Sequence, residues 1–324
     1  MLLAARLTEG PSRRRGCTAL CVSKDLKTWT EREPFYAPGL FFTHECPDLF
    51  RLGDWWYLLF SEFSERHVTR YRMSRSLAGP WYAPAGPEDT LDGRAWYAAK
   101  TASDGERRFA FGWNATREGE KDYRPWQWGG NLVVHELLQA VDGALAVNVP
   151  EMVDAALDTP VPFSFEPGLG MFMDSGHTVT LGASGAFGCA MGGALPDLCK
   201  IELSISFDMH TRSCGLMLRS SDDFETSYYI RLEPHRNRLV FDSWPRPGDV
   251  AQMAELERPL TLTPGVPVDI SVFVEGTVCE IYAGGRIAMS TRLYNLPSGK
   301  WGVFATEGVA SFHEVRLFTR QIPL

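Results

Sequence analysis

The sequence predicts an all-β protein in which the blade-like sheets of a β-propeller are followed by an antiparallel β-sandwich. Short runs rich in Val, Ile, Phe, Tyr and Trp recur between clusters of Gly, Pro, Asp and Asn, as strands do between turns. No long segment keeps the period of 3.6 residues that marks an amphipathic helix. The spacing of the apolar runs changes near residue 170, which indicates two domains.

Residues 1–155 are predicted to form the propeller-type domain. From Cys17 to about Val149 the chain repeats a pattern of strand, turn and strand, and each group holds an aromatic-rich strand, as at 55–63 and 107–113. Asp-Gly and Gly-Asp pairs stand at the tips, where tight turns need residues that tolerate a left-handed backbone. This rhythm is typical of propeller blades rather than of a closed barrel.

Residues 156–170 are predicted to be a linker, because they are rich in Pro and Gly and lose the alternation. Residues 171–324 are predicted to form the β-sandwich, since their strands alternate apolar and polar side chains with turn signals between them. These strands are expected at 200–208, 215–220, 227–233, 238–242, 268–274, 277–283 and 301–305.

Composition restricts the classes of partner. The chain has 324 residues and a formal net charge of −8, which argues against a nucleic acid held through its phosphates. No apolar run approaches the roughly 18 residues that span a bilayer, and the N-terminal run is too short for a signal peptide. The seven cysteines are scattered without metal-ligand spacing. We therefore expect a soluble, cytoplasmic protein with no membrane partner, no metal and no cofactor.

The stretch T-H-E-C-P-D-L-F-R-L at residues 43–52 carries the most chemical information. Glu45 and Asp48 flank a proline just before an apolar strand, so both carboxylates are expected at a strand entrance, where the central cavity of a propeller opens. By composition alone, a glutamate before a strand is more often a surface residue, and that alternative stays open.

Several short motifs occur in a fixed order along the chain, and this order indicates a family. E-C-P-D followed by L-F stands at 45–50, and S-K-D-L-K-T-W precedes it at 23–29. D-G-R-A-W-Y-A, G-W-N, W-G-G, H-E-L with D-G-A-L, and V-E-G-T-V-C-E-I-Y follow at 92–98, 112–114, 128–130, 135–145 and 274–282. In this order they resemble glycoside hydrolase family 32, the invertases, levanases and inulinases. The resemblance implies a partial five-bladed β-propeller followed by a β-sandwich, and a carbohydrate substrate.

The resemblance also implies a mechanism. Glu45 matches the family's general acid/base in retaining hydrolysis of β-fructosides such as sucrose, inulin or levan, in which a second carboxylate attacks the anomeric carbon. The family's W-M-N-D-P-N-G and R-D-P segments, which hold two catalytic aspartates, are missing from this sequence. We therefore expect a poor or inactive glycosidase unless a complementing chain supplies the missing part.

An incomplete propeller exposes strand edges, so a homo-oligomer or low solubility is also expected. Ala95 and His135 depart from the family's Asp and Pro, which suggests an altered sugar subsite.

A second group of side chains is predicted to bind the sugar. Aromatic rings pack on the C–H faces of sugars, while polar groups bind the hydroxyls. The candidates are His44, Asp48, Trp96, Tyr97, Lys100, Trp113 and Trp128. The alternatives are that the tryptophans fill blade cores, that Asp48 makes a local hydrogen bond, and that Lys100 is an ordinary exposed lysine.

Two other functions remain open at this point. One is a non-catalytic carbohydrate-binding protein or pseudoenzyme with the same fold. The other is a relative of arabinanase and xylosidase propellers, because S-L-A-G-P-W at 76–81 is similar to their S-x-x-G-P-W segment. The E-C-P-D motif favours family 32 over the latter.

Overall fold

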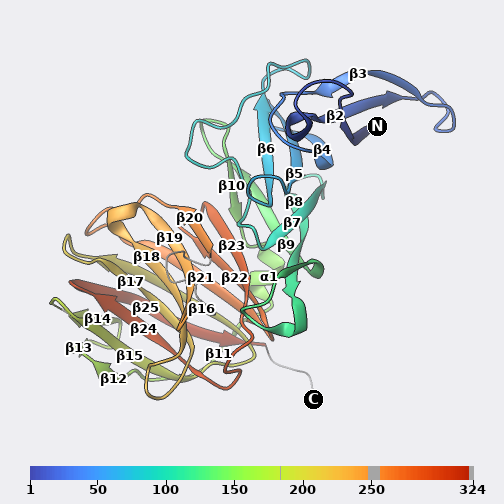
Figure 1. Ribbon diagram of the computed structural model, residues 1–324. Coiled ribbons are helices and arrows are strands. Elements are labelled where there is room, and N and C mark those ends of the chain that lie inside the picture. Colours follow the sequence, from blue (N-terminus) through green and yellow to red (C-terminus); the bar gives the residue numbers. More distant parts are fainter. Residues whose placement is uncertain (183, 247–255, 321–324) are drawn as a thin grey trace. The chain divides into compact units, whose positions relative to one another are not determined.

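The computed structural model describes residues 1–182, 184–246 and 256–320. Strands dominate the described chain (Figure 1). The chain divides into two compact units, of which the first comprises Met1–Ala115 and Gly129–Asn148, and the second Thr116–Trp128 and Val149–Leu324. The predicted all-β architecture, with propeller-type sheets followed by a sandwich, is confirmed.

The first unit consists of three antiparallel sheets, each running as a meander, which is the form of a propeller blade. The first sheet has the order β1(Leu2–Arg6), β2(Gly16–Val22), β3(Thr30–Tyr36). The second has the order β4(Glu45–Leu52), β5(Trp55–Glu62), β6(Val68–Ser74). The third has the order β10(Leu145–Asn148), β9(Trp126–Gln139), β8(Arg108–Arg117), β7(Trp96–Ser103). The short 3-10 turns η1(Ser12–Arg14) and η2(Glu118–Glu120) lie between strands.

Aromatic and aliphatic side chains hold these sheets together. Phe41, Leu58 and Phe60 form a buried cluster against which Leu2 and Tyr36 pack, so this cluster joins the first two sheets. Burial of such side chains is the main stabilising contribution to the unit.

Polar contacts tie the second sheet to the third. The hydroxyl of Tyr57, which is wholly buried, donates to the carbonyl of Gly143, in the turn between β9 and β10, at 2.6 Å. A buried hydrogen bond of this kind fixes where the two sheets meet, because breaking it leaves polar atoms unpaired.

The second unit is a sandwich of two antiparallel sheets, stacked face to face in Figure 1. The seven-stranded sheet has the order β12(Glu166–Leu169), β15(Phe187–Ala194), β24(Lys300–Thr306), β17(Ser213–Ser220), β18(Ser227–Glu233), β19(Arg238–Trp244), β20(Leu256–Pro259). The eight-stranded sheet has the order β13(Met171–Asp174), β14(Thr178–Gly182), β25(Val309–Thr319), β16(Leu198–Phe207), β21(Val268–Glu275), β22(Val278–Ala283), β23(Ile287–Arg292), with β11(Thr159–Pro160) paired to β25. The short helix α1(Glu151–Ala155) and the 3-10 turn η3(Pro234–Arg236) complete the unit. Alternate residues such as Ile201, Leu203 and Ile205 fill the space between the sheets.

The segment 156–170, expected to be a linker, contains the two short strands β11 and β12. Proline lacks a backbone N–H, and β11 accordingly pairs with β25 on one side only. No helix in the described ranges is long and apolar enough to cross a membrane.

The tip between β8 and β9, residues 116–128, belongs to the second unit. There the hydroxyl of Tyr228 donates to the carboxylate of Asp122 and accepts the backbone N–H groups of Tyr294 (2.9 Å) and Asn295 (2.8 Å). The side-chain amide of Asn295 also donates to Asp122, at 2.7 Å. Tyr228 and Asp122 are both buried, so this network anchors the tip.

The substitution Tyr228→Phe is expected to lower the free energy of unfolding of the second unit by about 1–3 kcal/mol, because it removes the acceptor of the Tyr294 and Asn295 N–H groups and takes a donor from the buried Asp122. Urea unfolding followed by circular dichroism measures the change. The matched control is Tyr123→Phe, whose ring is 57% exposed and whose effect is expected within about 0.5 kcal/mol. Equal stability of the two variants would contradict the role of this network.

Candidate active site

Glu45 opens strand β4 at a β-bulge. In the pairing with β5, Glu45 lies opposite Ser61 and Asp48 opposite Leu59, so β4 holds an extra residue between these positions. Cys46 takes up the distortion with a left-handed backbone, φ +48°. Bulges redirect side chains and are common beside active sites. This bulge places both carboxylates, three residues apart, toward the same neighbouring strand, β7.

Strand β7 meets Glu45 with a bulge of its own. Its register against β8 shifts between Tyr97 and Lys100, and Ala98 has φ +58°. The hydroxyl of Tyr97 donates to Oε2 of Glu45 at 2.8 Å, and the backbone N–H of Ala98 donates to the hydroxyl of Ser61 at 3.1 Å. Burial, and then the negative charge of Glu45, raise the pKa of Tyr97, so the phenol stays neutral and donates.

Asp48 and Lys100 extend the same contact between β4 and β7. Oδ2 of Asp48 accepts hydrogen bonds from the N–H and the hydroxyl of Thr101, both at 2.7 Å. Nζ of Lys100 donates to the carbonyl of Pro47 at 2.7 Å. Both side chains, predicted to bind the sugar, are therefore engaged in joining the second sheet to the third.

A stack of rings stands beside the Glu45 carboxylate. The imidazole of His67 lies 4.1 Å from the Tyr97 ring, with 12° between the planes, and Trp113 lies 5.5 Å from Tyr97. Nδ1 of His67 and the carbonyl of Arg94 share a hydrogen bond of 3.0 Å. Of these residues, Tyr97 and Trp113 were predicted from the sequence, whereas His67 was not, because it lies outside every motif.

Trp96 lies on the opposite side of β7 from Tyr97, as successive residues of a strand do. Its indole is wholly buried, donates to the carbonyl of Val133 at 3.2 Å, and packs 4.8 Å from His135. His135 and Asp92, both fully buried, share a 2.9 Å contact between Nε2 and Oδ2. Trp96 and His135 therefore belong to the core of the third sheet, where neither presents a face to a ligand.

His44 is also a core residue. It is wholly buried, stacks on Phe60 at 4.4 Å and shares a hydrogen bond with Thr18 at 3.3 Å. Burial, and then the positive charge of Arg72, lower the pKa of His44 from 6.5 to about 4. This neutral, buried imidazole packs at the start of β4, next to Glu45 in the sequence, and does not face the solvent.

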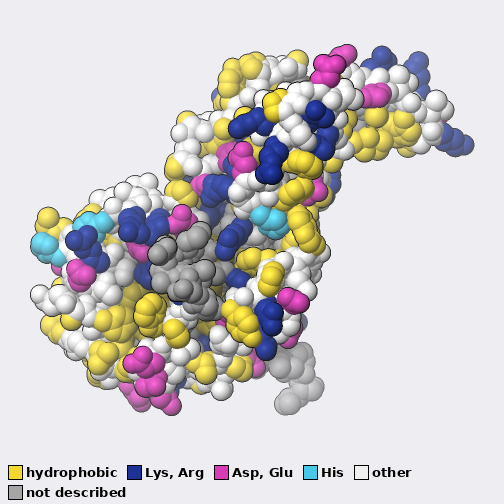
Figure 2. Space-filling view, viewed as in Figure 1, with side chains coloured by type: hydrophobic (Ala, Val, Ile, Leu, Met, Phe, Trp, Pro, Cys, Tyr) yellow, Lys and Arg dark blue, Asp and Glu magenta, His cyan; other side chains and the backbone are white. Residues whose placement is uncertain are grey.

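Trp128 belongs to the second compact unit, and its side chain is 66% exposed. Among the residues with described coordinates, no group of three His, Cys, Asp or Glu side chains is arranged to hold a metal ion. All seven cysteines are free thiols, five of them buried. Basic, acidic and apolar side chains are interspersed on the face of the molecule in Figure 2.

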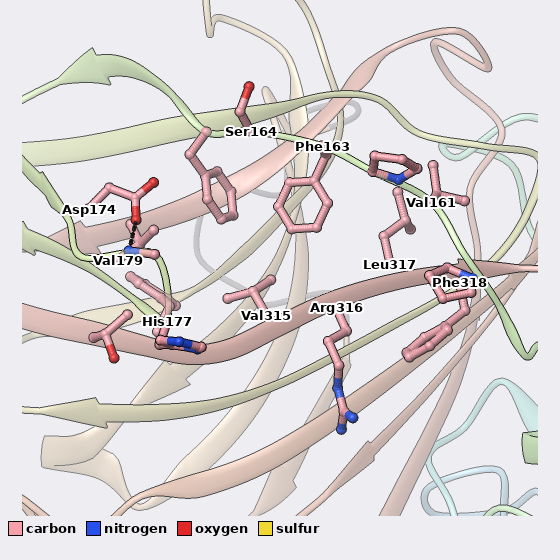
Figure 3. A pocket seen from close by; sticks show the side chains of 16 residues that line it. Val161, Phe163, Ser164, Asp174, His177, Val179, Val315, Arg316, Leu317 and Phe318 are labelled. Atoms are coloured by element: carbon pink, nitrogen blue, oxygen red, sulfur yellow. Dashed lines mark hydrogen bonds between the residues drawn. The ribbon is translucent and has the colours of Figure 1, made fainter.

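The sandwich carries a hollow of about 340 Å3 between residues 160–165 and strand β25. In Figure 3, Phe163, Val315 and Leu317 converge on it, while the Arg316 side chain extends away from them. Phe163 also packs edge-on against Trp301, with ring centroids 4.8 Å apart. Because its walls are mainly apolar, this hollow is a packing feature of the segment that enters the sandwich.

Comparison with known proteins bears on both units. The model of the glycosyl hydrolases family 32 N-terminal domain matches residues 4–147, and that of the family 32 C-terminal domain matches residues 177–319. The chain belongs to glycosyl hydrolase family 32. Its sequence is 25% identical over 342 aligned residues to a sucrose-6-phosphate hydrolase of Zymomonas mobilis, an alignment that covers 94% of this chain and 60% of the relative. The chain thus spans about 60% of the length of the curated relatives it matches.

Solved structures share the fold. A sucrose-6-phosphate hydrolase from Lactobacillus gasseri is similar with a TM-score of 0.65 and 18% identity, covering 99% of this chain and 63% of that one. A family 32 β-fructofuranosidase of Bombyx mori is similar with a TM-score of 0.64 and 16% identity, covering 100% of this chain and 64% of that one. These family members have the propeller and sandwich arrangement that the sequence predicts.

The pKa of His44 makes stability depend on pH. Between pH 6.5 and 4 the unfolded chain binds a proton at His44 that the folded chain does not, so stability falls as the pH decreases through this window. His44 is expected to account for about 2 kcal/mol of the loss between pH 7 and pH 5. Urea unfolding at both pH values measures it, and His44→Gln should reduce the difference. His210→Gln, at an exposed position, is the control and should leave the difference unchanged; an unchanged difference in His44→Gln would refute the assignment.

Proposed function

We propose that this chain provides the acid/base part of a β-fructosidase active site, with Glu45 as the general acid/base. The observation that carries the proposal is the bulged entrance of β4, where Tyr97, whose ring packs against His67 and Trp113, donates to the Glu45 carboxylate at 2.8 Å. This hydrogen bond fixes the orientation of the carboxyl group, which an acid/base needs in order to face the oxygen of a glycosidic bond. Family membership supports the same chemistry.

Retaining hydrolysis needs a second carboxylate about 5–5.5 Å from the acid, to attack the anomeric carbon. The two carboxylates closest to Glu45 along the paired strands are engaged elsewhere. Asp48 accepts two hydrogen bonds from Thr101, and Glu62, wholly buried, accepts two from Arg70 at 3.1 and 3.0 Å. We therefore propose that the attacking carboxylate is supplied by a polypeptide segment outside this chain.

The relatives support a proposal for the substrate class. Two curated relatives are sucrose-6-phosphate hydrolases, and the similar solved structures include β-fructofuranosidases and a fructan 1-exohydrolase from Cichorium intybus. We propose a β-fructoside, such as sucrose, its 6-phosphate or a short fructan, cleaved between the fructosyl carbon and the bridging oxygen.

Chemical rescue tests the role of Glu45. If the attacking carboxylate is missing, azide is expected to take its place. It forms a C–N bond to the anomeric carbon while the C–O bond breaks, and Glu45 gives its proton to the departing oxygen. The chain incubated with sucrose and azide should then release glucose and fructosyl azide, detectable by mass spectrometry, at a rate at least tenfold above that without azide.

The variant Glu45→Gln should lose the rescued reaction, because an amide cannot deliver the proton. The matched control is Glu65→Gln, whose side chain is 49% exposed and which should react like the unaltered chain. Rescue that persists in Glu45→Gln would refute the assignment of the acid. Retention of the sugar with no azide product would favour a non-catalytic carbohydrate-binding protein.

A further inference from the structure

The outer face of the seven-stranded sheet carries a hollow of about 380 Å3, within the range of small-molecule sites. It extends across the sheet, because its lining comes from β12, β15, β24, β17, β18 and β19 and from the turn between β17 and β18. All of these residues belong to the second unit, so the hollow can be described apart from Glu45.

The floor of this hollow is aromatic and rigid. The ring of Phe304 lies edge-on to Tyr229, with centroids 5.0 Å apart and 85° between the planes, and parallel to Phe187 at 5.9 Å and 18°. These rings pack on a buried cluster that includes Met191 and Met217. Apolar side chains are therefore fixed on the face of the sheet that points away from the sandwich core.

Gly215 of β17 lies between Phe304 and Arg231 in this sheet. It pairs with Phe304 of β24 on one side and with Arg231 of β18 on the other, so no side chain stands between the ring and the guanidinium. Its φ is +154°, and a Cβ there would lie 1.9 Å from the carbonyl oxygen of Ile230. Only glycine fits this position. Phe304 and Arg231 both line the hollow, so a ligand there can touch an aromatic ring and a charged group together.

Charged side chains line the hollow together with these aromatic rings, and hydrogen bonds hold them in place. Nη2 of Arg231 donates to Asp242 at 3.1 Å, and its Nε pairs with Glu233 at 2.9 Å. Arg246 donates to Asp242 from its Nε at 3.0 Å. The Asp242 side chain is only 4% exposed. Asp242 also accepts the backbone N–H of Ser243 at 3.1 Å, so its role is to hold the Arg231 guanidinium in one orientation.

Trp244 and a pair of hydroxyls complete the lining. Trp244 follows Asp242 by two residues on β19, which puts both side chains on the same face, and its indole is 53% exposed. The hydroxyls of Ser213 and Thr306 lie 2.8 Å apart and also line the hollow. Exposed indole and hydroxyl groups suit a ligand that is apolar on its faces and polar at its edges.

We propose that this hollow binds a neutral saccharide of one or two rings, stacked on Trp244 and the Tyr229–Phe304 floor, with hydroxyls bound by Arg231, which Asp242 holds in place, and by Ser213 and Thr306. The ionised lining consists of three carboxylates, Asp223, Glu225 and Asp242, and one guanidinium, Arg231, which disfavours a phosphorylated or otherwise anionic ligand. The proposal does not rest on Glu45, and it gives the sandwich a binding role of its own.

Affinity electrophoresis of the whole chain through gels containing inulin, levan, arabinan or dextran tests the proposal. At least one polysaccharide should retard the unaltered chain, and Trp244→Ala should weaken that retention about tenfold, because a large stacking surface is lost. Asp242→Asn should weaken it as well. Circular dichroism confirms that each variant is folded.

Two controls separate this site from the rest of the chain. Trp29→Ala removes another exposed indole and should be retained within twofold of the unaltered chain, whereas Glu45→Gln, at the proposed acid, reports whether the saccharide is bound there instead. Failure of all four polysaccharides to retard the chain overturns the proposal, as does undiminished retention of Trp244→Ala. Loss of binding in Glu45→Gln would place the saccharide at the other site and overturn it too.

Discussion

The candidate active site depends on the contact between strands β4 and β7, which belong to neighbouring sheets of the first unit. Three polar links cross this contact, from Tyr97 to Glu45, from Lys100 to Pro47 and from Thr101 to Asp48. Each strand is bulged where the links are made, so the bulges are matched. A slip of one residue in either strand would turn these side chains to the wrong face.

Backbone strain is concentrated at this contact. Cys46, Ala98 and His67 all have left-handed backbones, with φ between +48° and +58°, and none is glycine. Such conformations are unfavourable and persist only where the surrounding contacts determine them. Here the ring stack of His67 on Tyr97 and the hydrogen bond from Ala98 to Ser61 provide those contacts. These contacts thereby surround the carboxylate of Glu45 and hold the strand entrance that carries it in one conformation.

The two faces of the seven-stranded sheet differ: one packs into the sandwich core and the other faces outward. Residues such as Ile230 and Leu232 are wholly buried in the core, whereas Tyr229 and Arg231, which alternate with them, face outward. The outward residues combine rings with oriented charges instead of the scattered polar groups of an ordinary solvated face. The alternation that builds the core therefore also creates the outer hollow.

Local pattern was enough to predict the fold class and the centre of the candidate site. Strand periodicity and turn residues act over a few positions, so the all-β architecture is visible in the sequence. The E-C-P-D and W-Y-A motifs likewise point to Glu45 and Tyr97, which the structure brings within 2.8 Å. The sequence alone could not separate Tyr97 from Trp96, because adjacent strand residues point to opposite faces and the W-Y-A motif includes both.

Only the tertiary structure decided which of those side chains contact Glu45: Trp96 and Tyr97 are both buried, and it is Tyr97 that donates to the carboxylate. His67 reaches the site from a turn, and no local pattern in the sequence predicts this contact. Trp244 and Gly215 shape the outer hollow because strands that are far apart in the chain pair with one another. The sequence by itself determined the strands, the domain order and the acidic residue. Strand register, which depends on bulges and on packing between sheets, decided which residues surround it, because contacts between distant segments leave no short-range signal.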